Sequence, residues 1–133
     1  MDKQTVLVID DDPDIVASLA RVLAVAGYNT HCCHDYDGVI ECVGAVAPDL
    51  IVSDINLAGQ SGLRLIETIK RDMGMSGTPV IFLSGAQIPD IIRRAHEAGG
   101  TYYLRKPFDP QVLLELVDKA LWMPHLVQAA GAK

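Results

Sequence analysis

Carboxylate, hydroxyl and ammonium side chains stand at or just after the ends of several short apolar runs in this 133-residue sequence. They are Asp10, Asp11, Asp54, Ser84 and Lys106. A carboxylate nucleophile, further carboxylates for a divalent cation, a hydroxyl and a lysine are the groups that phosphoryl transfer uses, because its transition state spreads charge over the phosphoryl oxygens. These residue types therefore point to phosphoryl-transfer chemistry, provided that the fold brings them together.

The elements that must position these groups follow from two alternating hydrophobic patterns. Continuous apolar runs, typical of strands covered on both faces of a parallel sheet, lie at 5–9, 28–33, 50–53, 79–83 and 101–104. Amphipathic stretches between them predict helices over 13–26, 36–46, 62–73, 89–98 and 110–122. Asp12 before Pro13 is a typical helix N-cap. The alternation predicts an α/β fold of (βα)₅ type, with an open, doubly wound, parallel five-stranded sheet.

The carboxyl ends of parallel strands are where ligands bind to such a sheet. If the first and third strands are neighbours, Asp10, Asp11 and Asp54 form one cluster there. Two carboxylates ~4 Å apart repel by about 4 kcal/mol at an effective dielectric constant near 20, so the cluster costs stability without a cation. All-oxygen ligation at an open site favours Mg²⁺. Removal of one of these charges is therefore expected to stabilise the metal-free protein.

Length and composition exclude several classes of protein. A chain of 133 residues has the size of one domain. Eleven Lys and Arg against seventeen Asp and Glu give a net charge of −6, which disfavours direct nucleic-acid binding and adsorption to anionic membranes. There is no apolar run of the roughly 18 residues that a membrane span needs. Cys32, Cys33 and Cys42 lack zinc-ligand spacing and are expected to be reduced thiols of a cytoplasmic protein.

With these residues in place, the chain resembles the receiver domain of two-component response regulators, of the type found in chemotaxis and phosphorelay proteins. The resemblance covers residues 4–122 and leaves 123–133 as a C-terminal tail or the start of a linker. Segment 6–13 resembles the strand that ends in the family's acidic pair, and segment 61–63 resembles the loop that opens the third helix. The remaining matches are Asp54 to the phospho-acceptor, Ser84 to the family's hydroxyl, Lys106-Pro107-Phe108 to its lysine–proline signature and Tyr103 to its aromatic switch position.

The resemblance implies a flavodoxin-like fold with strand order 2-1-3-4-5, in which the first and third strands are adjacent. It also implies a metal site. Mg²⁺ would be held by Asp11, Asp54 and the backbone carbonyl of Asn56, with Asp10 acting mainly through water. The Lys106-Pro107 peptide bond would be cis, which proline makes tolerable.

The implied function is that of a phospho-accepting switch rather than of an enzyme that turns over a substrate. A sensor histidine kinase or a histidine phosphotransfer protein would donate a phosphoryl group to Asp54, and Lys106 and Ser84 would bind it. Tyr103 would then rotate and reshape the face formed by helix 4, strand 5 and helix 5. That face would bind a downstream protein or a second copy of the chain.

Two residues depart from the family pattern, and two other functions fit part of the sequence. Ala58 replaces a usual proline and is expected to loosen the loop after Asp54, while Gly85 is expected to widen access to the phosphoryl site. A haloacid-dehalogenase-type phosphatase also uses an Asp-x-Asp strand end, as in Asp10–Asp12, but the length and the separate Asp54 disfavour it. A degenerate receiver that serves only as a docking module is disfavoured by the full set of site residues.

Overall fold

Five parallel strands form the central sheet of the computed structural model, which describes residues 3–85 and 90–122. They are β1 (Thr5–Ile9), β2 (Asn29–Cys33), β3 (Leu50–Asp54), β6 (Val80–Ser84) and β7 (Tyr102–Arg105). Their order across the sheet is β2-β1-β3-β6-β7, and every neighbouring pair is parallel. Without the short β4–β5 hairpin, this is the predicted order 2-1-3-4-5, so the flavodoxin-like topology is confirmed.

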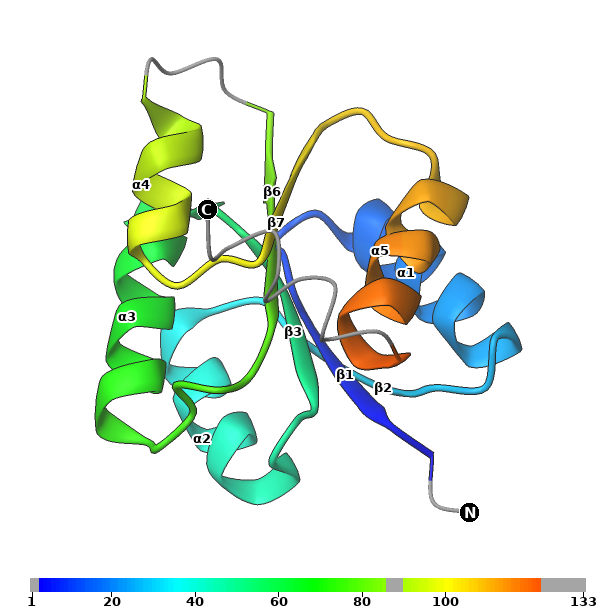
Figure 1. Cartoon of the computed structure of the whole chain (residues 1–133), viewed down its shortest axis with the longest axis horizontal. Helices are drawn as coiled ribbons and strands as arrows, with labels where there is room; N and C mark the ends of the chain where they lie inside the picture. The colour runs from blue at the N-terminus through cyan, green and yellow to red at the C-terminus, as the bar shows by residue number, and fades with distance from the viewer. Residues whose placement is uncertain (1–2, 86–89, 123–133) are drawn as a thin grey trace.

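Helices cover both faces of this sheet, which confirms the doubly wound architecture (Figure 1). The helices α1 (Pro13–Val25) and α5 (Pro110–Trp122) pack on one face. The other face is covered by α2 (Tyr36–Val46), α3 (Gly62–Asp72) and α4 (Ile91–Glu97). No helix in the described part of the chain combines the length and the apolar character that crossing a membrane requires.

The core lies in two layers because side chains of a strand alternate between the faces of the sheet. Val6 and Val8 of β1 belong to the cluster under α1 and α5, whereas Leu7 and Ile9 belong to the cluster under α2, α3 and α4. All four side chains are fully buried, as are those of the central strands β3 and β6 apart from small exposed fractions at their polar ends. This double burial explains why the central strands read as continuous apolar runs.

Two local differences separate the structure from the sequence-based expectations. Strand β2 lies at the sheet edge, so residues Asn29–Cys33 are exposed or half-buried rather than covered on both faces. An unpredicted antiparallel hairpin, β4 (Asn56–Leu57) with β5 (Gln60–Ser61), interrupts the connection between β3 and α3. The predicted start of the fourth helix at residue 89 and the tail at 123–133 lie outside the described residues.

Candidate functional site

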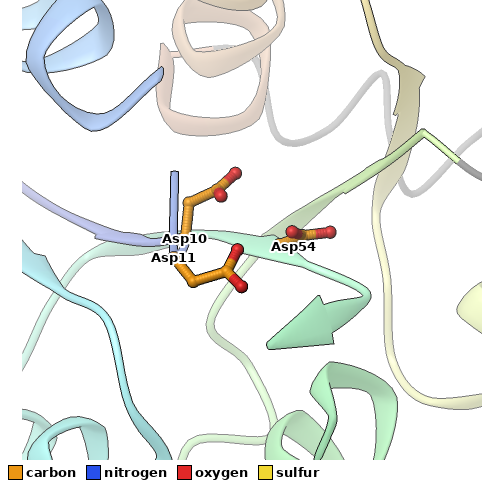
Figure 2. A group of neighbouring side chains, drawn as sticks. All are labelled: Asp10, Asp11 and Asp54. Atoms are coloured by element: carbon orange, nitrogen blue, oxygen red, sulfur yellow. The ribbon is translucent and has the colours of Figure 1, made fainter. Parts of the chain in front are cut away.

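Two adjacent strands deliver the carboxylates to one place. Ile9 of β1 pairs with Ser53 of β3, so Asp10 and Asp54 leave the sheet side by side at its carboxyl edge. Figure 2 shows Asp10, Asp11 and Asp54 as neighbours at the ends of these two strands. One carboxylate oxygen from each lies within 4.8 Å of the others. The clustering that the sequence predicted from strand order is therefore present.

Lys106 lies between the two buried members of this cluster. Its Nζ is 2.9 Å from Oδ2 of Asp10 and 3.1 Å from Oδ2 of Asp54, and it donates a hydrogen bond to the latter. Asp10 is fully buried and Asp54 is 6% exposed, whereas Asp11 is exposed. Two buried carboxylates thus share a single ammonium group, which leaves uncompensated negative charge in a desolvated place.

The pKa values reflect this arrangement. Burial, followed by the charge of Asp10, raises the pKa of Asp54, although the Asn56 backbone amide and Lys106 act in the opposite direction. Burial lowers the pKa of Lys106, but its contacts with Asp10 and Asp54 outweigh burial and the net shift is upward. Lys106 therefore stays protonated, whereas burial and the neighbouring Asp10 disfavour the charged form of Asp54. Such a carboxylate gains from a further cation.

Backbone amides of the loop after β3 orient the carboxylates. The Asn56 amide donates to Oδ1 of Asp54 at 3.2 Å, and the Ala58 amide donates to Oδ2 of Asp11 at 3.0 Å. Ala58 has a φ of 50°, a value closed to proline, and a proline there would also lack the donor. The Ala58 amide thus ties this loop to Asp11, just after β1, and the expected loosening of the loop stays a prediction.

A glycine makes the close approach of this loop to helix α3 possible. The Gly62 amide donates to the Ile55 carbonyl at 2.6 Å, and a side chain at this position would overlap the backbone oxygen of Asp54. Ser61 caps the helix by accepting a hydrogen bond from the Arg64 amide at 3.2 Å. Segment 61–63 thus fixes where α3 begins relative to Asp54.

A cavity of about 610 Å³, within the size range of small-ligand sites, opens above these groups. Its lining includes Asp11, Asp54, Ser84, Lys106 and, from helix α4, Arg94. Ser84 is 2% exposed at the end of β6, and Gly85 beside it is exposed and also lines the cavity. The predicted acid, hydroxyl and ammonium groups therefore border one space.

The sequence analysis also named Tyr103 and the Lys106-Pro107 peptide bond. Tyr103 does not line this cavity; it is half-buried on β7 and borders a separate cleft of about 100 Å³ with Ile92 and His96 of α4. The Lys106-Pro107 peptide bond is cis, as the resemblance implies. Sequence reasoning named Lys106 as the cation of this site and did not name Arg94 of α4, which lines the same cavity. Arg93 and Arg94 are adjacent in the sequence, and no local signal indicates which of them lines the cavity.

Comparison with known proteins identifies the family. Residues 6–118 match the family model of the response regulator receiver domain. The chain belongs to the response regulator receiver family. Receiver domains are signalling switches, which favours a regulator over the phosphatase alternative. The receiver fold also accounts for the placement of the acidic residues at the ends of β1 and β3.

Two curated relatives of this chain are longer proteins that are named as DNA-binding regulators. It is 35% identical over 121 residues to the DNA-binding transcriptional regulator NtrC of Escherichia coli, covering 91% of this chain and 25% of that protein. It is 30% identical over 119 residues to the DNA-binding response regulator MtrA of Mycolicibacterium smegmatis, covering 90% and 51%. The chain thus spans between a quarter and a half of the length of these relatives.

A solved structure gives the same fold. The chemotaxis response regulator CheY4 of Vibrio cholerae superimposes with a TM-score of 0.83 at 25% sequence identity, covering 90% of this chain and 100% of that one. Receiver domains bind Mg²⁺ through an acidic pocket, and the Asp10, Asp11 and Asp54 group could hold such an ion. The donor set is made only of oxygens and lies beside an open cavity, which fits a hard divalent cation.

Proposed function

We propose that this chain is a phospho-accepting signalling switch and that Asp54 accepts the phosphoryl group from a phosphohistidine. The observation that carries the proposal is the position of Asp54. Its carboxylate is buried beside Asp10 and 3.1 Å from the Lys106 ammonium, and it borders the same cavity as Ser84. An acceptor carboxylate, a cation and a hydroxyl thus surround one space large enough for a phosphoryl group.

The transfer step uses these groups as follows. An oxygen of the Asp54 carboxylate forms a bond to phosphorus while the bond between phosphorus and the imidazole nitrogen breaks. The nitrogen keeps the electron pair of that bond, and Asp54 becomes an acyl phosphate. Lys106, held charged by its carboxylate neighbours, offsets the charge on the phosphoryl oxygens, and Ser84 hydrogen-bonds one of them.

The metal site in this proposal consists of Asp11, Asp54 and the backbone carbonyl of Asn56. The divalent cation supplies charge neutralisation to the phosphoryl oxygens when it is bound. Asp10 acts mainly through water in this site. It also orients the ammonium group of Lys106, whose Nζ lies 2.9 Å from Oδ2 of Asp10. Both roles explain why a fully buried carboxylate is placed here.

The output of the switch is a changed protein-binding face on α4, β7 and α5. Tyr103 lies on β7, next to the strand that ends in Ser84, and the half-buried residue borders a cleft of about 100 Å³, which supports a change in its position. Ile92 of α4 and Val112 of α5 are 64% and 41% exposed and supply apolar surface on two of these helices. The proposed partners are a sensor histidine kinase or histidine phosphotransfer protein as donor, and a downstream protein or a second copy as receiver of the signal. The domain itself acts in the cytoplasm without contacting nucleic acid or membrane.

The test is chemical labelling. Incubation with acetyl phosphate and Mg²⁺ is expected to add the mass of one phosphoryl group, and Asp54→Asn is expected to abolish the addition. Asp72→Asn is the matched control, because Asp72 is an exposed carboxylate that, among the residues the structure describes, pairs only with Arg71. The adduct should hydrolyse at alkaline pH, as an acyl phosphate does and a serine ester does not. Labelling that persists in Asp54→Asn, or wild-type protein that never labels, would contradict the proposal; the latter is the behaviour of a docking module.

A further inference from the structure

A second cation borders the cavity above Asp54. Ile91 and Arg94 are three residues apart on α4 and therefore share one side of the helix. Ile91 is 7% exposed and lines the cavity together with Arg94, so this side of α4 faces the acidic site. Across the cavity lie Asp54 and Lys106.

Neighbouring Arg93 shows what an ordinary surface arginine does on this helix. Its guanidinium group pairs with Asp90 at 3.5 Å and with Glu97 at 3.1 Å, and both partners are exposed. Within residues 3–85 and 90–122, by contrast, Arg94 makes no ion pair and no side-chain hydrogen bond. Its charge is thus available to a ligand in the cavity, whereas that of Arg93 is already matched.

The charge of the site indicates which ligand needs it. Asp10, Asp11 and Asp54 carry three negative charges against one on Lys106, and a bound divalent cation would bring the sum to zero. Phosphorylation replaces the single charge of Asp54 by a phosphoryl group carrying about −1.5 to −2 at pH 7, so roughly one negative charge is again unmatched. The planar, multiply donating guanidinium group of an arginine suits phosphoryl oxygens better than a second lysine would.

We propose that Arg94 is a second cationic ligand of the phosphoryl group on Asp54, brought to it by helix α4. This inference rests on the proposed function and adds a residue to it. The contact joins α4 directly to the phosphorylated residue, in addition to any route through Ser84 and Tyr103. Because α4 also carries the exposed Ile92, movement of Arg94 toward the phosphoryl group would alter the partner-binding face.

Beryllium fluoride, which mimics a phosphoryl group on a carboxylate, provides the test at fixed, saturating Mg²⁺. Its affinity is measured by calorimetry for the wild type, Arg94→Ala, Arg94→Lys and the matched control Arg93→Ala. Arg94→Ala is expected to weaken binding about fivefold to tenfold, as the loss of a charge-assisted hydrogen bond does. Arg94→Lys should keep part of the affinity, and Arg93→Ala should bind as the wild type does. Amide NMR should show a smaller response of α4 to the mimic in Arg94→Ala.

Each outcome separates this inference from the function on which it rests. Equal affinities of Arg94→Ala and the wild type would overturn the role of Arg94 and leave the acceptor role of Asp54 intact. An equal loss in Arg93→Ala would show a general effect of charge and would also overturn it. Wild-type protein that neither binds the mimic nor labels with acetyl phosphate would contradict the proposed function instead. Affinity for Mg²⁺ alone should not fall in Arg94→Ala, and thermal melts verify that each variant is folded.

Discussion

Two polar clusters lie at opposite ends of the parallel strands, and they differ in how well their polar groups are matched. At the carboxyl edge, Asp10 and Asp54 share the single ammonium group of Lys106. At the amino edge, the buried Tyr28 precedes β2; its hydroxyl donates to Asp118 and accepts a hydrogen bond from Nε1 of Trp122 at 2.9 Å. The first cluster carries excess charge, and the second matches its donors to its acceptors.

The pKa values express the same difference. Burial, followed by the hydrogen bond to Asp118, raises the pKa of Tyr28 to about 12, so the hydroxyl remains a donor at any physiological pH. Burial also raises the pKa of Asp54, but there it disfavours the very form that phosphoryl transfer requires. A satisfied cluster stabilises the fold, whereas an unsatisfied one is retained where a ligand completes it. The contrast therefore separates a structural tie from a binding site.

The largest effect is expected at the structural tie. Tyr28→Phe removes the hydroxyl that joins Asp118 and Trp122, and should lower the free energy of unfolding by about 1–2 kcal/mol. Urea unfolding measures this loss. The matched control is Tyr102→Phe, since Tyr102 is half-buried and its hydroxyl has no hydrogen bond within the described residues. If both variants lose the same stability, the hydroxyl network contributes nothing beyond the ring.

Removal of a charge at the carboxyl edge should instead raise the free energy of unfolding. Asp54→Asn leaves Lys106 paired one-to-one with Asp10 and keeps an acceptor for the Asn56 amide, so the metal-free protein should gain about 1 kcal/mol once solvent screening is allowed for. The raised pKa of Asp54 sets the pH dependence. Folded protein binds this proton more tightly than unfolded protein, so ionisation of Asp54 destabilises the fold as the pH rises through the folded pKa.

The gain in Asp54→Asn should accordingly be full at neutral pH and vanish below the ordinary Asp value of 3.8. Urea unfolding in EDTA across this pH range measures it, with Asp72→Asn as the carboxylate control. If the stability gain of Asp54→Asn instead grows toward low pH, folding lowers the pKa of Asp54 rather than raising it. A loss of stability at neutral pH would show that Lys106 fully compensates both buried carboxylates.

The smallest effect is expected for Asp11. Its charge adds repulsion, but its Oδ2 also accepts the Ala58 amide at 3.0 Å, so Asp11→Ala should change the metal-free melting temperature little. The hydrogen bond from Ala58 thus offsets the gain in stability that the relief of charge repulsion alone predicts for Asp11→Ala. Mg²⁺ should raise the melting temperature of the wild type, because it binds only the folded cluster, and should raise that of Asp11→Ala much less. Equal increases in both proteins would exclude Asp11 as a ligand.

The sequence by itself determined the order of the elements and the strand ends on which the acidic groups stand. Hydrophobic periodicity and helix caps are local properties, and the Asp12 cap is present, with its carboxylate accepting the Asp14 amide at 2.9 Å. The acidic cluster followed from placing the first and third strands side by side. The exposure of β2 did not follow, because an apolar run does not reveal whether its strand has one neighbour or two.

Only the tertiary structure decided which distant side chains meet. Tyr28 and Trp122 are 94 residues apart in the chain and touch because α5 returns across the sheet to the start of β2. Arg94 lines the same cavity as Asp54 because the packing of α4 turns one side of the helix toward the site, and nothing in the local sequence distinguishes it from Arg93. The direction of a helix face depends on what the helix packs against, so contacts between elements are determined by the assembled core and not by the periodicity of any one segment.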